Sequence, residues 1–406
     1  MTDLFWPGDH LAGDLMSDGA FLAAMLAVEQ AWLDGLVDAA VAPTAAGVTL
    51  PTDVDADDVA LQSDVDGNPV SALVALLRSR TPEPASRWIH RGLTSQDVVD
   101  TALMLCLRDV LTRLAEEVGS QLAVLVALTE KHRHTVALAR TLTQPALPTT
   151  IGTRTAAWLT GLLDAAEPLR RVELAAQFGG AVGTLAAVVE LTGSVQDALD
   201  LTGRTARRLG LADVAPWHTT RAPITRIGDL LAGLCDAWGH LAADVATGSR
   251  AEIGEFTEGH GGGSSTMPHK NNPVRSVLIR RAALTAGPLA GTLHTAAATS
   301  VDERADGAWH AEWATIGALA RRTVVAATHT TELLTGLRVD ADRAAANLAA
   351  AGDLGAEQST MAALVGREAH STYLGVTDHL VDAALERAAT YSAGQNDAAH
   401  YRKDAP

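Results

Sequence analysis

Apolar residues recur every three or four positions over much of this chain, which is the spacing that places side chains on one face of an α-helix. The longest such stripe begins after Val99 and predicts one helix of about 30 residues. Its apolar positions are Leu103, Leu107, Val110, Leu111, Leu114, Val118, Leu122 and Leu125. Similar stripes predict further helices at about 149–174, 220–251, 273–298 and 310–337.

Long helices with apolar faces need partners, so the pattern predicts an all-α fold built around a helical bundle. We expect three domains. An N-terminal helical domain at 1–98 is followed by a central long-helix bundle at 99–338, which carries a mobile loop at about 255–270. A small C-terminal helical domain at 339–406 is expected to end in a frayed polar tail from about Ser392.

The composition agrees with this fold and limits the partners. Of the 406 residues, 47% are hydrophobic and 4% are aromatic, and a sequence this rich in Ala and Leu favours helix over sheet. The formal net charge of −17 argues against a nucleic-acid partner, because phosphate binding needs clustered Lys and Arg.

Cysteine usage and hydropathy favour a cytoplasmic protein. Cys106 and Cys235 lie far apart in apolar helical segments, which predicts two buried free thiols rather than a disulfide or a metal site. No charged-then-apolar leader precedes Phe5, and no uninterrupted apolar run reaches about 20 residues. We therefore expect neither secretion nor a membrane span.

The segment 263–273, with the sequence GSSTMPHKNNP, carries the most specific chemistry in the chain. Glycines at its start give the backbone the freedom to swing the hydroxyls of Ser264 and Ser265 over a ligand, and the prolines that follow stiffen it. Lys270 and Asn272 offer an ammonium and an amide donor for negative charge that grows on a carboxylate during proton abstraction. An ordinary flexible linker is the alternative.

A second polar group, 87–97, precedes the longest predicted helix. It places His90, Thr94 and Ser95 at a helix start, where free N–H groups and the positive end of the helix dipole favour a carboxylate. The alternative is that Thr94 or Ser95 only caps the helix, with Asp97 in its first turn.

A third polar group, 139–150, is expected to be a loop between two helical runs. Arg140 offers a planar fork for a carboxylate, and Thr141 and Gln144 can donate to oxygen atoms. The alternative for Arg140 is an ion pair with an acidic residue at the end of the preceding helix.

These three groups resemble conserved regions of the fumarase/aspartase superfamily, whose members make or break a C–N or C–O bond beta to a carboxylate. The resemblance lies in the motif GSSxMPxKxNP at 263–273, in HxGxTSxD at 90–97, and in the second conserved region at 139–150.

Three further segments resemble the 3-carboxy-cis,cis-muconate cycloisomerase branch more than fumarase, aspartase or argininosuccinate lyase. They are 177–184, 216–221 and 302–313, and the likeness runs over about residues 60–380.

The resemblance implies the three-domain superfamily fold, a homotetramer with a core of about 20 helices, and active sites shared among three subunits, without a cofactor. It also implies a catalytic group formed by Ser264, Ser265, Lys270 and His90. The residues expected to bind a small di- or tricarboxylate substrate are Asn68, Arg87, Thr94, Ser95, Gln96, Arg140, Thr141, Gln144, Gln177, Trp217, Arg221, Met267 and Asn272.

The leading expectation for the activity is the reversible, cofactor-independent lactonisation of 3-carboxy-cis,cis-muconate. Two departures point to a smaller or differently charged substrate: Pro145 stands where the cycloisomerase branch usually carries His, and Asn271 where a basic residue is common. A lyase releasing fumarate from a substituted succinate is the alternative, either from nitrosuccinate with loss of nitrite or as another C–N lyase similar to adenylosuccinate lyase. An inactive structural homologue is the remote alternative.

Other conspicuous residues are expected to be structural. Trp309 and Trp313, four positions apart on one helix, are expected to pack together, and Glu312 to orient its neighbours. His132 and His134 are expected to be solvated at a helix end, so that no metal site is predicted.

Overall fold

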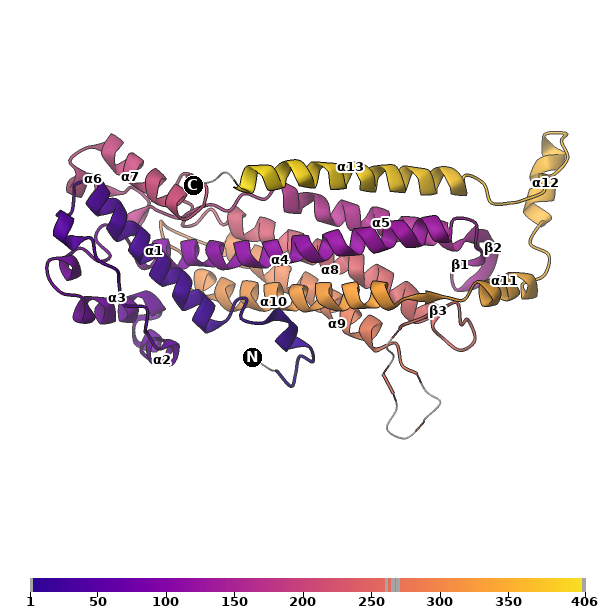
Figure 1. The fold of residues 1–406 in the computed structure, drawn as a ribbon, viewed down its shortest axis with the longest axis horizontal. Coiled ribbons are helices and arrows are strands. Elements are labelled where there is room, and N and C mark those ends of the chain that lie inside the picture. The colour runs from indigo at the N-terminus through magenta and orange to yellow at the C-terminus, as the bar shows by residue number, and fades with distance from the viewer. Residues whose placement is uncertain (1–2, 260–261, 264–266, 268–270, 404–406) are drawn as a thin grey trace. The chain divides into compact units, whose positions relative to one another are not determined.

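A computed structural model of the protein describes residues 3–259, 262–263, 267 and 271–403, with side chains as far as residue 394 (Figure 1). The chain divides into two compact units, each assembled from three separate stretches. Unit 1 consists of 1–113, 171–229 and 288–322, and unit 2 consists of 114–170, 230–287 and 323–406. The division into three consecutive domains stays a prediction.

Four long helices confirm the predicted all-α architecture. They are α4 (Ser95–Lys131), α8 (Ala222–Gly248), α9 (Val274–Thr299) and α10 (Gly307–Gly336), and each contributes to both units. Their ends lie close to the predicted ones, although α4 begins earlier and reaches 37 residues. Every apolar position of the predicted α4 stripe is buried, so the spacing of three and four marks the packed face of the helix.

Unit 1 adds shorter helices around its portions of the long ones. They are α1 (Asp18–Asp38), α2 (Ala56–Asp66), α3 (Pro69–Arg80), α6 (Ala186–Thr192) and α7 (Val195–Arg208). Unit 1 also contains four short 3-10 turns. They lie at Asp9–Ala12, Thr44–Ala46, Ala85–Arg87 and Gly180–Val182.

Helix α1 is long and apolar enough, by length and composition alone, to cross a membrane. The lack of a long uninterrupted apolar run did not predict such a helix. Its Trp32, Leu33 and Leu36 are fully buried, and 61% of its most apolar window is buried within the protein. Burial of this extent is what the core helix of a folded domain shows.

A charged cluster lies in the core of unit 1. The guanidinium of Arg221 donates to Asp100 Oδ2 at 2.7 Å and to Glu312 Oε2 at 2.6 Å, and all three side chains are fully buried. Trp309 Nε1 also donates to Asp100, at 3.0 Å. Although burial acts to lower it, the two carboxylates raise the pKa of Arg221 above its ordinary value.

Unit 2 adds four α-helices and two small sheets to its portions of the long helices. Its elements are β1 (Val136–Thr141), β2 (Gln144–Thr150), α5 (Ile151–Ala166), β3 (Phe256–Thr257), β4 (Arg338–Val339), α11 (Ala341–Ala350), α12 (Ala356–Leu364) and α13 (Thr377–Lys403). Strand β1 pairs with β2, and β3 with β4, both antiparallel. Helices α5 and α13 lie side by side (Figure 1).

The prediction of a loop at 139–150 is wrong, because β1 and β2 form a hairpin with a two-residue turn. Thr141 pairs with Gln144, and Leu142 and Thr143 both have positive φ, 47° and 71°, as the favoured two-residue turn requires. Pro145 is accommodated in β2 because a two-stranded sheet has only edge strands, in which a residue without an N–H is tolerated.

The prediction of a frayed tail from Ser392 is also wrong for the backbone, since α13 continues to Lys403. No proline interrupts that stretch, and its alanines favour helix. The prediction of free thiols is confirmed: Cys106 and Cys235 are both unpaired and buried, and burial raises the pKa of each to about 12.

We expect the Arg221→Met substitution to lower the free energy of unfolding by about 3–5 kcal/mol, because it leaves two buried carboxylates without their cation. Denaturant unfolding measures the change. The exposed Arg204, whose Nε donates to the carbonyl of Asp200, supplies the control Arg204→Met, which should change little. Equal stability of both variants would contradict the structural role of the cluster.

Replacing Leu142 and Thr143 by Asn and Gly should raise the free energy of unfolding by about 1–3 kcal/mol, because Asn-Gly adopts positive φ without the strain that a β-branched residue carries there. The control is a double alanine variant, which removes both side chains but keeps the strain. A gain of the same size in both variants would mean that the turn backbone is not strained.

Candidate active site

The start of α4 is organised by Asp97 rather than by a hydroxyl cap. The fully buried Asp97 carboxylate accepts the backbone N–H groups of Thr94, Gly179 and Gly180 at 2.9–3.0 Å. Thr94 stands directly before the helix, and its backbone N–H is bound by the Asp97 carboxylate in the first turn, as in one half of a capping box. Ser95 is half-buried at the first position of the helix.

His90 lies in the loop before α4 and is bound to a carboxylate from another helix. Its Nδ1 is 2.6 Å from Oε1 of Glu29 in α1. The His90 side chain is 16% exposed, whereas that of Glu29 is fully buried. With φ at 60°, His90 adopts a left-handed backbone conformation that is uncommon outside glycine.

Arg304 also reaches this loop. Its Nη1 donates to the Thr94 hydroxyl at 2.7 Å, and its guanidinium carbon lies 5.6 Å from the Trp309 ring centroid. Arg304 is exposed, so a positive charge at the surface of unit 1 stands next to the α4 N-terminus. A carboxylate is the ligand that such a combination favours.

Four other predicted binding residues of unit 1 are buried in the network behind this loop. The Gln177 side chain donates to Asp97 and accepts the N–H of Trp217 at 2.6 Å, and Gln96 donates to Asp100 and to the His218 carbonyl. Arg221 is held by the two carboxylates described above. These donors are engaged within the protein, so Gln96, Gln177, Trp217 and Arg221 support the site's framework.

Asn68 and Arg87 are also engaged locally. Asn68 caps α3, since its Oδ1 accepts the N–H of Val70 at 3.1 Å and its Nδ2 donates to the Asp66 carbonyl at 3.0 Å. Arg87 is 72% exposed and lies 3.5 Å from Glu83. Asn68 stands at a helix start, and Arg87 retains an accessible charge.

In unit 2, Arg140 faces a buried carboxylate from a distant part of the chain. Glu255 is fully buried and contacts Arg140 Nη1 at 3.4 Å, Arg154 Nη1 at 3.0 Å and Asn347 Nδ2 at 3.0 Å. The ion pair considered for Arg140 exists, although its acid is Glu255 and not a residue at the end of α4. Two arginines share this one carboxylate, which leaves positive charge at the hairpin.

Thr141 and Gln144 face each other as the residues that flank the hairpin turn. Both are exposed, and the Gln144 amide donates to the Thr143 hydroxyl at 3.3 Å. Pro145 pairs with Arg140 in the ladder. The second motif, at 139–150, therefore presents amide and hydroxyl groups beside Arg140. It has no titratable group at position 145.

The base of the segment 263–273 is fixed on both sides. Gly262 and Asn272 exchange two backbone hydrogen bonds, at 3.0 and 2.9 Å. The buried Glu258 caps α9, because its carboxylate accepts the N–H groups of Arg275 and Ser276 and the Ser276 hydroxyl, at 2.6–3.0 Å. Met267 is 41% exposed, whereas Ser264, Ser265 and Lys270 lie outside the described residues.

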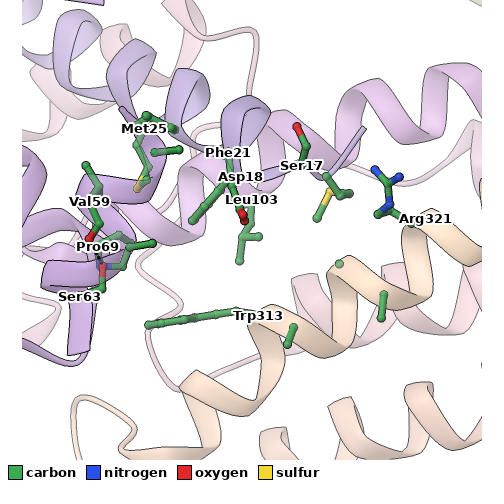
Figure 2. Close-up of a pocket in the computed structure, with 17 residues that line it drawn as sticks. Ser17, Asp18, Phe21, Met25, Val59, Ser63, Pro69, Leu103, Trp313 and Arg321 are labelled. Atoms are coloured by element: carbon green, nitrogen blue, oxygen red, sulfur yellow. Dashed lines mark hydrogen bonds between the residues drawn. The ribbon is translucent and has the colours of Figure 1, made fainter. Parts of the chain in front are cut away.

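Each unit contains a cavity. The cavity in unit 1, of about 460 Å³, is lined mainly by apolar residues such as Met25 and Trp313 (Figure 2). Its Arg321 is already paired with Asp9 at 2.8 Å. The cavity in unit 2, of about 560 Å³, lies beside the base of the segment. It is lined by Glu258, Gly259, Arg275, Thr331, Glu332, Leu333, Thr335 and Gly336.

The prediction that His132 is solvated is wrong. His132 is buried because α5 begins against it, with the N–H of Gly152 donating to the His132 carbonyl at 2.8 Å. Burial lowers the pKa of its imidazole. Over the described ranges, no group of three or more His, Cys, Asp or Glu side chains is arranged to hold a metal ion.

Glu29 and Arg304 are the two site residues that sequence reasoning missed. Arg304 lies in a segment that carries the family resemblance, so its charge was visible beside Trp309. Glu29 gave no local signal beyond one acidic position within an apolar helical stripe. Trp309 and Trp313 pack as expected, with ring centroids 4.6 Å apart.

Comparisons with known proteins agree with this architecture. A family model described as lyase matches residues 41–286. Nitrosuccinate lyase of Streptomyces davaonensis is 40% identical over 82% of this chain and 73% of its own length. The 3-carboxy-cis,cis-muconate cycloisomerase of Bradyrhizobium diazoefficiens is 39% identical over 79% of this chain and 70% of its own length.

Solved structures give the same result. The 3-carboxy-cis,cis-muconate lactonizing enzyme from Pseudomonas putida matches with a TM-score of 0.80 and 27% identity, over 94% of this chain and 97% of that one. A fumarate lyase from Mesorhizobium matches with a TM-score of 0.78 and 25% identity, over 92% of this chain and 97% of that one. Together with the motifs, these matches show that the chain belongs to the lyase family of the fumarase/aspartase superfamily and is an enzyme of the lyase or cycloisomerase type.

Proposed function

We propose that the protein catalyses a cofactor-independent elimination beta to a carboxylate, in which the leaving group departs as a stable anion. The observation that carries this proposal is Pro145, which occupies the second motif where the cycloisomerase branch usually has a histidine. Proline can neither donate nor accept a side-chain proton. The chemistry is therefore restricted to leaving groups that need no proton at that position.

This restriction separates the candidate reactions. An amine or a hydroxide leaves readily only when an acid protonates it in the transition state. Nitrite and a carboxylate are already stable as anions, so both can leave unassisted. Loss of nitrite from nitrosuccinate and opening of a carboxymuconolactone satisfy the restriction, whereas hydration of fumarate and release of an amine do not.

The charges of the site support a substrate with more than one carboxylate. In unit 1, Arg304 and the N-terminus of α4 offer donors beside Thr94. In unit 2, Arg140 and Arg154 share one buried carboxylate, so their combined charge is only half neutralised. Each group suits one carboxylate of a diacid.

Ser264 or Ser265 is the proposed base for the carbon-bound proton. In the sequence both serines lie between Gly262 and Asn272, which exchange two backbone hydrogen bonds. Lys270 and backbone N–H groups would stabilise a serine alkoxide once water is excluded. The electron pair of the C–H bond forms the double bond as the anion leaves.

We further propose that the active enzyme is a homotetramer whose sites combine motifs from three subunits. The first motif, at 90–97, belongs to unit 1, whereas the second, at 139–150, and the third, at 263–273, belong to unit 2. Long apolar helices offer the kind of surface that oligomerisation covers. On this proposal each site takes its carboxylate-binding groups from different copies of the chain.

Nitrosuccinate is the proposed substrate. Asn271 stands where the cycloisomerase branch commonly has a basic residue, which removes one positive charge from the third motif and favours two carboxylates over three. The nitrosuccinate lyase relative agrees with this choice. Lactonisation of 3-carboxy-cis,cis-muconate is the second candidate, favoured by the cycloisomerase relative and by the lactonizing-enzyme structure.

Incubation of the purified protein with nitrosuccinate is expected to release nitrite and fumarate in equal amounts, because one elimination produces both. Colorimetric nitrite detection and fumarate absorbance measure them. A parallel incubation with 3-carboxy-cis,cis-muconate follows the diene absorbance. Loss of the diene signal without nitrite release would select the second candidate, and activity on neither compound would reject both.

The Ser264→Ala/Ser265→Ala double variant is expected to lower kcat by at least about 100-fold, since it removes the proposed base. Thr266→Ala is the matched control, because it deletes a neighbouring hydroxyl of the same loop. Size-exclusion chromatography should show the same oligomer for all three proteins. An unchanged kcat in the double variant would refute the role of the serines.

A further inference from the structure

Glu29 is a buried carboxylate that no recognised motif contains. It lies in the middle of α1 and is 1% exposed. Its Oε1 is 2.6 Å from His90 Nδ1, and its buried Oε2 has no hydrogen-bond partner among the described residues. Placing an ionised carboxylate there is costly unless a cation stands beside it. The nearest candidate for that cation is the His90 ring.

The backbone around His90 is fixed so that this pairing is kept. Arg78 Nη2 donates to the carbonyl of Ile89 at 2.8 Å, and Trp32 Nε1 donates to the carbonyl of Arg91 at 2.7 Å. The residues on both sides of His90 are thus held by side chains. Trp32 lies one turn after Glu29 on α1, so one helix face positions both the ring and the loop.

The ring is oriented by its Nδ1, which leaves Nε2 for a ligand. The His90 side chain is 16% exposed, and its hydrogen bond to the described residues is made through Nδ1. The Glu29 carboxylate at Nδ1 accepts the proton of that nitrogen. When Nε2 also carries a proton, it can donate it in a charge-assisted hydrogen bond.

Three charged groups are linked electrostatically in this part of unit 1. They are Glu29 on α1, Arg78 on α3 and Arg91 in the loop itself, and Arg78 interacts electrostatically with the other two. Burial is the main cause that lowers the pKa of Arg78, and Glu29 opposes that change. Glu29 is the acidic member of this group, whereas Arg78 and Arg91 carry the opposite charge.

We propose that Glu29 is a positioning residue that holds His90 as an imidazolium, with its Nε2–H directed to a carboxylate of the bound substrate. The proposal rests on the proposed function only in taking the substrate to be a di- or tricarboxylate. His90 then adds a third cationic or polar donor to Thr94 and Arg304 in the same loop region. No proton is transferred in this role, since the imidazolium only binds.

The test is a double-mutant cycle with the substrate that the wild-type enzyme converts. Glu29→Gln and His90→Gln should each raise KM about 10- to 100-fold, the value of one charge-assisted hydrogen bond, with a smaller effect on kcat. The double variant should be no worse than His90→Gln alone, because Glu29 acts through the ring. Independent, multiplicative effects would overturn the proposal.

Two further variants separate positioning from folding. Glu29→Asp keeps the charge and is expected to recover part of the KM lost in Glu29→Gln; no recovery would contradict an electrostatic role. Asp38→Asn removes an acid from the same helix, where it binds the exposed Arg208, and should leave KM unchanged. Thermal unfolding followed by circular dichroism compares the folding of all variants.

A readout without substrate keeps this proposal distinct from the proposed function. Diethyl pyrocarbonate modifies neutral imidazole, and mass spectrometry of the digested protein reports the rate at His90. Near pH 7, the reagent should modify His90 several-fold faster in Glu29→Gln than in the wild-type protein. The exposed His134 in the same digest should be modified at the same rate in both. Equal rates at His90 would overturn the pairing, even if neither candidate substrate were converted.

Discussion

Buried carboxylates that must be satisfied are the constraint on which the candidate site depends. Asp97, Glu29, Glu255 and Glu258 are each almost completely buried. Glu29 and Asp97 support the segment 87–97, Glu255 the hairpin, and Glu258 the end of the segment 263–273. A buried carboxylate without partners is strongly destabilising, so the chain around each one must present N–H groups or cations to it. The free energy of unfolding therefore depends on the loops keeping the conformation that satisfies these carboxylates.

The same constraint explains why the two units hold their motifs differently. In unit 1, Asp97 collects backbone N–H groups from two distant segments, which fixes a helix start. In unit 2, Glu255 binds side-chain cations at the hairpin and Glu258 caps α9, so the bases of both segments are anchored, while the hairpin tip at Leu142 is exposed. Rigid bases with accessible tips suit residues that meet a ligand.

The amino-acid pattern predicted the long helices well, because their apolar spacing is a property of each segment alone. The α4 stripe and the free thiols are examples. The hairpin at 136–150 was not predictable in this way, since Pro145 and the polar residues around it indicate a loop until the partner strand is known. His132 was misjudged for the same reason: its burial is produced by the start of α5, which approaches it from 20 positions further along the chain.

The candidate site shows the same division between local and distant information. Motif spacing identified the segments of His90, Arg140 and Asn272. It could not show that the side chains of Gln96 and Gln177 form hydrogen bonds within the protein and not to a ligand. Nor could it show that Glu29 faces His90, because 61 residues separate them. Partners that converge only in the folded chain leave no trace in a local pattern.

The position of Arg304 has an optical consequence. Its guanidinium covers the indole of Trp309 while it binds the Thr94 hydroxyl, and Trp309 in turn stacks edge-on against Trp313. Any anion that draws Arg304 away changes the polarity next to a buried chromophore. The protein thus contains its own fluorescent indicator for occupancy of the α4 N-terminus, without an attached dye.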